Sequence, residues 1–172
     1  MDDNRLNMKK SLLLLMGAAL LMSCGNSSEK MKRLVKENLE VSVECPKQLH
    51  VIAVSEPDSA FGTGYFTQEE VKGMLQTMKV VTDTIMKRTD NMSRFNPADH
   101  YVVSLAERQM RSMAEIRSLI AHGDKKGEFS GWKVKIDYQC VDAAGLPYRS
   151  ERWCFIDKDG KQVFKSFELP IP

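Results

Sequence analysis

An alternation of apolar and polar residues near the C-terminus decides the fold class: Trp132-Lys133-Val134-Lys135-Ile136-Asp137-Tyr138-Gln139. Alternation with a period of two predicts a β-strand that buries one face and exposes the other. The stretch Asp142–Pro147 then has the composition of a turn, and Tyr148–Asp157 returns with further apolar residues. This order predicts an antiparallel β-hairpin.

The apolar residues of the hairpin set its expected register. Pairing Val141 with Tyr148 turns the apolar side chains of both strands to the same face. Lys158-Asp159-Gly160 then predicts a three-residue loop whose glycine is left-handed, leading into a third strand. The predicted meander has eight large apolar side chains on one buried face: Trp132, Val134, Ile136, Trp153, Phe155, Val163, Phe167 and Leu169.

Two long amphipathic helices precede this meander. The first begins at a capping box from Thr67 to Glu70 and is predicted to run to about Met92. The second begins at Asn96-Pro97, as N-cap and first helical residue, and ends at His122-Gly123. Because few residues join them, the helices should form an antiparallel hairpin. Their apolar stripes are Val71, Met74, Leu75, Met78, Val81 and Ile85 in the first, and Val102, Leu105, Met113, Ile116 and Ile120 in the second.

The segment before the helical hairpin adds a helix and a strand. Glu29–Leu39 has apolar residues at helical spacing, and Gln48–Ser55 is predicted as a strand. Ala60–Phe66 is predicted as a loop, because it contains Gly62-Thr63-Gly64. Residues 29–172 are thus expected to form one α+β domain, with an N-terminal helix and strand, a long antiparallel helical hairpin and a C-terminal three-stranded antiparallel meander.

The first residues have the pattern of an export signal. Met8-Lys9-Lys10 is a basic region, and Ser11–Leu21 is an apolar region too short to span a bilayer. Leu21-Met22-Ser23-Cys24 resembles the bacterial lipobox, in which the cysteine thiol takes a lipid and the chain is cut just before it. Residues 1–23 are therefore predicted as a lipoprotein signal peptide and residues 24–28 as a lipidated tether. The alternative is an ordinary secretory signal followed by a chance cysteine.

The charge and cysteines of the mature chain exclude some functions. Cleavage removes three of the 25 basic and two of the 23 acidic residues, and leaves 149 residues with a net charge of +1. A surface with this nearly neutral mixture of charges does not predict the basic patch by which proteins bind nucleic acid. Cys45, Cys140 and Cys154 remain beside the anchor. The expected register sets Cys140 and Cys154 five residues apart on opposite faces, so no disulfide between them is expected.

The polar residues offer little chemistry. His50, His100 and His122 have no second ligand at the spacing of a metal site, so no metal or cofactor is expected. Cys45 and Cys154 lack the signature of a catalytic thiol. No catalytic residue is predicted.

Three stretches resemble small lipoproteins of Bacteroidetes that have no assigned function. They are the lipobox ending in Cys24-Gly25-Asn26, the run Ser55–Phe61, and Phe129–Val134 with the later Phe155–Asp159. The resemblance implies helices laid against a curved antiparallel sheet, as in cystatin-like or NTF2-like folds, and it transfers no catalytic residues. Surface-exported lipoproteins of that phylum tend to carry acidic residues soon after the cysteine. Here the first is Glu29, which favours an outer-membrane anchor facing the periplasm.

Three functional hypotheses follow. The leading one is a non-enzymatic lipoprotein, held on the membrane by lipid on Cys24, that binds an envelope protein or a small ligand. The second is an NTF2-like ligand-binding protein or enzyme with Tyr138 and either Arg149 or Glu151 on a concave sheet face. The third is a cystatin-like protease inhibitor. The expected core is apolar and closed, with no pocket between helices and sheet.

Overall fold

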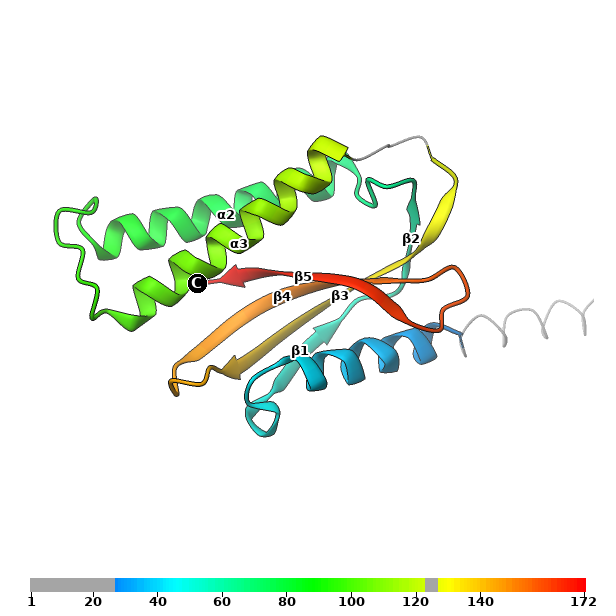
Figure 1. Cartoon of the computed structure of the whole chain (residues 1–172), viewed down its shortest axis with the longest axis horizontal. Helices are drawn as coiled ribbons and strands as arrows, with labels where there is room; N and C mark the ends of the chain where they lie inside the picture. The colour runs from blue at the N-terminus through cyan, green and yellow to red at the C-terminus, as the bar shows by residue number, and fades with distance from the viewer. Residues whose placement is uncertain (1–26, 123–126) are drawn as a thin grey trace, which may run out of the picture.

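The computed structural model describes residues 27–122 and 127–172. It confirms the α+β class: within these ranges, three helices pack against one antiparallel sheet of five strands (Figure 1). The predicted signal peptide 1–23 and Cys24 lie outside the described residues. The N-terminal helix covers residues 27–42, so Ser27 and Ser28, the last two residues of the predicted tether, are helical. No described helix is long and apolar enough to cross a bilayer.

The sheet has the strand order β1-β3-β4-β5, with β2 also paired to β3. The strands are β1 His50–Val54, β2 Asp58–Phe61, β3 Phe129–Val141, β4 Pro147–Ile156 and β5 Val163–Ile171. The predicted meander is present as β3–β4–β5. Strand β2 was not expected, because Ser55-Glu56-Pro57 reads as the end of a strand. The chain instead resumes pairing beyond this interruption, with Ser59 opposite Trp132.

The expected register of β3 against β4 is wrong by one residue. Val141 pairs with Pro147, so Val134 faces Cys154 and Lys135 faces Trp153. The cause lies in the turn: Asp142 N donates to the Leu146 carbonyl (3.0 Å), which leaves a three-residue loop of Ala143, Ala144 and Gly145. Gly145 is left-handed (φ 83°), as such a loop requires.

The β4–β5 hairpin has a loop that is one residue longer than expected. Asp157 N donates to the Gln162 carbonyl (3.1 Å), so the loop has four residues, and Val163 pairs with Ile156 rather than Phe155. Gly160 is left-handed (φ 69°), as predicted. The register then shifts within the strand, and Phe167 lies opposite Trp153.

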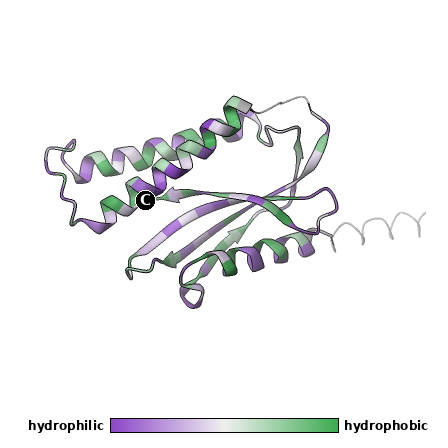
Figure 2. Cartoon of the chain, in the orientation of Figure 1, coloured by the Kyte–Doolittle hydropathy of each residue, from purple (hydrophilic) through white to green (hydrophobic). Residues whose placement is uncertain are grey.

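These registers divide the apolar residues between two sheet faces, contrary to the prediction of one. A one-residue slip reverses the face of every side chain in a strand. One core lies under the N-terminal helix and the other under the helical hairpin, and both helical layers alternate hydrophobic and hydrophilic residues (Figure 2). The first contains Met31, Val35, Leu39, Val134, Ile136, Tyr138, Cys154 and Ile156. The second contains Phe66, Met74, Met78, Val81, Ile116, Phe155, Phe167 and Leu169.

The helical hairpin is confirmed with changes at its ends. Helix α2 spans Gln68–Arg88 and begins at the predicted capping box, but it ends before Met92, because three left-handed residues starting at Asp90 break it. Helix α3 spans His100–His122, three residues later than expected. Its cap is Asp99, whose Oδ1 accepts from Val102 N at 3.2 Å.

The buried stripes of α2 and α3 differ from the predicted ones at single positions. Met74, Met78, Val81 and Ile85 of α2 are buried, whereas Leu75 is exposed. In α3 the last buried position is Leu119, and the predicted Ile120 is 47% exposed.

Helix α3 also closes one edge of the sheet. It lies along β5, and its Ser112 hydroxyl donates to the Glu168 carbonyl at 2.5 Å. An unpaired strand edge is a site for unwanted pairing with other chains, so this cover protects β5. It also brings the first half of α3 to the end of the sheet where β3 turns into β4.

Candidate functional site

A partly buried carboxylate, that of Glu168, organises the end of the sheet beside α3. Glu168 on β5 accepts hydrogen bonds from the Tyr138 hydroxyl, from Arg152 Nε at 3.1 Å and from Arg108 Nη2 at 3.2 Å. A second Arg152 nitrogen also donates to it. Tyr138 is fully buried, and the Arg152 side chain is 10% exposed. We call Glu168, Arg152, Arg108 and Tyr138 the Glu168 network.

Strands β3, β4 and β5 and helix α3 each supply one member of this network. Arg152 and Glu168 lie opposite each other on β4 and β5, on the face covered by the N-terminal helix. Arg108 reaches them from α3 past the sheet edge and also donates to Ser150. The last turn of the N-terminal helix adds Ser42, whose hydroxyl accepts from Arg152.

The ionisation of the network is fixed near neutral pH. Burial alone raises the pKa of Glu168, but the charges of Arg152 and Arg108 and the Tyr138 hydrogen bond outweigh it, and the pKa lies below its usual range. Burial, with the charge of Glu168, raises the pKa of Tyr138. Burial likewise raises the pKa of Tyr148 to about 12. The carboxylate is thus charged and both phenols keep their protons, so none of the three exchanges a proton readily near pH 7.

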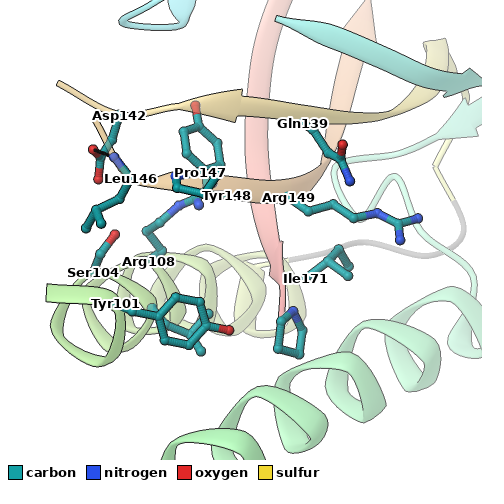
Figure 3. A pocket seen from close by; sticks show the side chains of 12 residues that line it. Tyr101, Ser104, Arg108, Gln139, Asp142, Leu146, Pro147, Tyr148, Arg149 and Ile171 are labelled. Carbon is teal, nitrogen blue, oxygen red and sulfur yellow. Dashed lines mark hydrogen bonds between the residues drawn. The ribbon is translucent and has the colours of Figure 1, made fainter. Parts of the chain in front are cut away.

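A hollow of about 290 Å³ lies beside the network, between the first turns of α3 and the β3–β4 hairpin (Figure 3). Figure 3 shows Arg108 rising from α3 toward the ring of Tyr148, and the guanidinium carbon lies 3.8 Å from that ring's centroid. The lining is largely apolar: Tyr101, Leu105, Leu146, Pro147, Tyr148, Ile171 and Pro172. A second hollow of about 470 Å³ adjoins it and reaches Glu44 and Glu168.

Two charged residues at the rim of the hollow, Asp142 and Arg149, differ in whether their side chains are already bound to other groups of the protein. Asp142 Oδ1 accepts from the backbone of Ala144 and Leu146, both at 2.9 Å, so this carboxylate is used by the turn. Arg149 is exposed on the rim and has no ion-pair partner among the described residues. It is the charged group best placed to meet a ligand.

A second buried charge lies at the other end of the sheet. Lys133, 2% exposed, donates to Glu70 Oε2 (2.7 Å) and the Tyr65 carbonyl (3.3 Å), and its Nζ lies 3.2 Å from Asp58 Oδ2. Glu70 is also the capping-box residue of α2. A hollow of about 240 Å³ borders this lysine. All three protons of the ammonium group have partners, so the lysine joins β2, β3 and α2.

The residues proposed for an NTF2-like site do not converge. Tyr138 faces the N-terminal helix, whereas Arg149 and Glu151 lie on the opposite sheet face. Glu151 is engaged there with the Trp153 indole (2.6 Å) and Lys135 (3.2 Å). The expectation of a closed core without a pocket is also wrong, because the hollow opens beside Tyr148.

The histidines lie apart from one another, whereas Cys140 Sγ donates to the Cys45 carbonyl at 3.4 Å. His50 is on β1, and His100 and His122 are the two end residues of α3. No group of three or more possible metal ligands lies within the described ranges. Cys140 and Cys154 are free and share one face, contrary to the expected opposite faces, but Cys154 is level with Val134, six residues from Cys140 along β3. Burial raises the pKa of Cys154 to about 12.

The sequence contained an ambiguous signal for the Glu168 network. The charged residues Arg152 and Glu168 are next to the apolar residues Trp153 and Phe167 in an alternating pattern. The expected register placed the apolar residues in the core and therefore turned the charged residues to solvent. A strand buried on both faces has no polar side, so alternation alone does not say which residues face out. Arg108 carried no signal, because a single arginine on an amphipathic helix is normally solvated.

No protein-family model, curated protein or solved structure matches the chain.

Proposed function

We propose that this chain is an envelope lipoprotein, anchored on the outer membrane through lipid on Cys24 and facing the periplasm, whose domain is a non-enzymatic binding module. The anchor rests on the basic region, the apolar region and the lipobox-like tetrad, which follow one another at the spacing of a lipoprotein signal. The binding role rests on the hollow beside the Glu168 network.

The lining of the hollow indicates its ligand. A small-molecule site is typically concave and mostly apolar, with a few polar groups that set orientation. Here the apolar wall comes from α3 and the β3–β4 hairpin, and Arg149 stands at the rim without a partner among the described residues. The geometry supports a small molecule with an apolar body and one acidic group.

The Glu168 network supports binding rather than catalysis. Glu168 is already bonded to Tyr138, Arg152 and Arg108, so it has little capacity left for a substrate proton. A network with satisfied hydrogen bonds is rigid. It holds Arg108 and Tyr148 as a fixed wall of the hollow.

Two dyes that share the same anilinonaphthalene body test the ligand class. 8-Anilinonaphthalene-1-sulfonate carries an anionic group that N-phenyl-1-naphthylamine lacks, and both fluoresce when they enter an apolar site. We expect the sulfonate to bind the mature chain severalfold more tightly, and Arg149→Gln to remove this difference. Arg33→Gln, at the first turns of the N-terminal helix, is the control. Equal binding of both dyes, or an unchanged preference in Arg149→Gln, would contradict the proposed ligand class.

The anchor has its own test. Cys24→Ser should abolish attachment of lipid and leave the protein uncut or soluble. Mass spectrometry of the membrane fraction measures this directly. A mature protein that begins elsewhere than Cys24, or that lacks acyl mass, would refute the anchor.

A further inference from the structure

The N-terminal helix begins very close to the proposed anchor. Residue 27 is helical and only three positions after Cys24. Three fully extended residues span about 10 Å, while the headgroup layer of one leaflet is about 5–8 Å thick. Lipid on Cys24, which is the anchor proposed above, therefore holds the beginning of this helix at the headgroup layer.

Two other segments lie beside the beginning of the helix. Ser28 Oγ donates to Glu56 Oε2 at 2.7 Å, which places the β1–β2 connection there. A Cβ at Gly160 would lie 3.5 Å from Met31 Sδ, which places the β4–β5 loop there as well. That loop exposes Lys158. Figure 1 shows the same arrangement, with this loop and the start of the helix at one end of the domain.

A cluster of aromatic side chains lies next to the β4–β5 loop, at the same end of the domain. The Trp132 indole N–H donates to the Lys158 carbonyl at 3.3 Å, and the Phe129 ring lies 5.4 Å from Trp132. Phe61 packs edge-on against Phe129 at 6.0 Å and is 51% exposed. Exposed aromatic rings are favoured at the boundary between headgroups and acyl chains.

We infer that this end of the domain lies on the lipid headgroup layer. We call it the membrane-facing end: the beginning of helix 27–42, the β4–β5 loop and the cluster of Phe61, Phe129 and Trp132. Helix 27–42 then leads away from the membrane, and its sixteen residues span about 24 Å. Its last turn reaches Arg152 through Ser42. The hollow beside the Glu168 network is thereby held away from the membrane and open to ligands in solution.

Hydrogen exchange on vesicles tests this orientation. The mature chain, with Cys45→Ser, is joined through Cys24 to a maleimide-bearing phosphatidylethanolamine in phosphatidylcholine vesicles, since Cys140 and Cys154 are buried. Amide exchange is compared with that of the same chain in solution. We expect severalfold slower exchange in the β4–β5 loop, residues 157–162. The matched β3–β4 loop, residues 142–146, should exchange at the same rate in both samples.

Two phenylalanines provide matched variants. Phe61 and Phe95 are similarly exposed, at 51% and 43%, but Phe95 lies in the α2–α3 connection. Phe61→Ser should reduce the protection of the β4–β5 loop, and Phe95→Ser should leave it unchanged. Unprotected residues 157–162, or protected residues 142–146, would overturn the orientation. Because the lipid is attached chemically, absence of acylation in cells would refute the anchor alone, and acyl mass reports that separately.

Discussion

The two networks of charged residues on the sheet, those of Lys133 and Glu168, differ in what surrounds them. All three protons of the Lys133 ammonium group have partners, and these contacts join β2, β3 and α2. Glu168 also has its partners, yet one of them, Arg108, lines a hollow at whose rim Arg149 has no ion-pair partner among the described residues. Because both networks adjoin a hollow, neither the burial of charge nor a neighbouring hollow marks a site by itself; a charged group at the rim that is not already paired does.

Removal of the Glu168 charge should have the largest effect. Glu168→Gln keeps the size of the side chain but leaves Arg108 and Arg152, whose side chains are largely buried, without a counter-charge. Breaking a buried ion pair in this way costs about 3–5 kcal/mol. Urea denaturation measures the free energy of unfolding. Glu115→Gln is the control, since this carboxyl is 46% exposed and its pairing with Lys165 contributes at most about 1 kcal/mol. Equal losses in the two variants would contradict the account.

Removal of the Lys133 charge should cost less. In Lys133→Met the apolar stem is retained, and the carboxylates of Asp58 and Glu70, which are 67% and 24% exposed, regain water. The expected loss is about 1–3 kcal/mol, as for unpaired polar groups. Dye binding at the Glu168 end should not change. A loss larger than that of Glu168→Gln would reverse the proposed order of the two networks.

Acid should weaken the Glu168 network in a smaller and graded way. The pKa of Glu168 is lowered in the folded protein relative to its ordinary value of 4.5. Its contribution to stability is therefore fully present above about pH 4.5, and it is lost as the pH falls through the folded pKa. Thermal unfolding measured from about pH 5 down to about pH 2, which covers the range below the ordinary carboxyl pKa, should show a shallower acid decline in Glu168→Gln than in the wild type. Parallel curves would show that Glu168 is not the group involved.

The smallest expected effect concerns the capping box beside Lys133. Thr67→Ala removes the hydroxyl that accepts from Glu70 N at 3.2 Å, and an N-cap of this kind contributes about 1 kcal/mol. Thr77→Ala, at a partly exposed position within the same helix, should be nearly neutral. Chemical denaturation of both variants checks this. A loss in Thr77→Ala as large as that in Thr67→Ala would show that the cap is not the cause.

The sequence predicted the helices and strands better than it predicted which residues lie opposite each other on neighbouring strands. The capping box, the helical hairpin and the meander depend on local patterns, and they are present. The β3–β4 register depends on a turn, and the choice between a three-residue and a four-residue loop reverses the face of every residue in β4. Gly145 was the deciding residue, since its left-handed conformation permits the shorter loop.

The candidate site was less predictable because its parts are distant in sequence. Arg108, Arg152 and Glu168 come from α3, β4 and β5, and only the three-dimensional packing brings them together. The expected candidate Tyr138 does belong to the network, but as a buried hydroxyl. Arg149, one of the two alternatives expected beside Tyr138, lies on the opposite face and lines the hollow.

The most direct test of the account is an NMR titration of the mature chain with 8-anilinonaphthalene-1-sulfonate. Amide shifts should concentrate in residues 101–108 and 142–149, which line the hollow beside the Glu168 network. Amides around Lys133 and Tyr65, at the other end of the sheet, should not move. Shifts that centre on Lys133, or that spread evenly over both ends, would contradict the claim that the hollow beside the Glu168 network is the binding site.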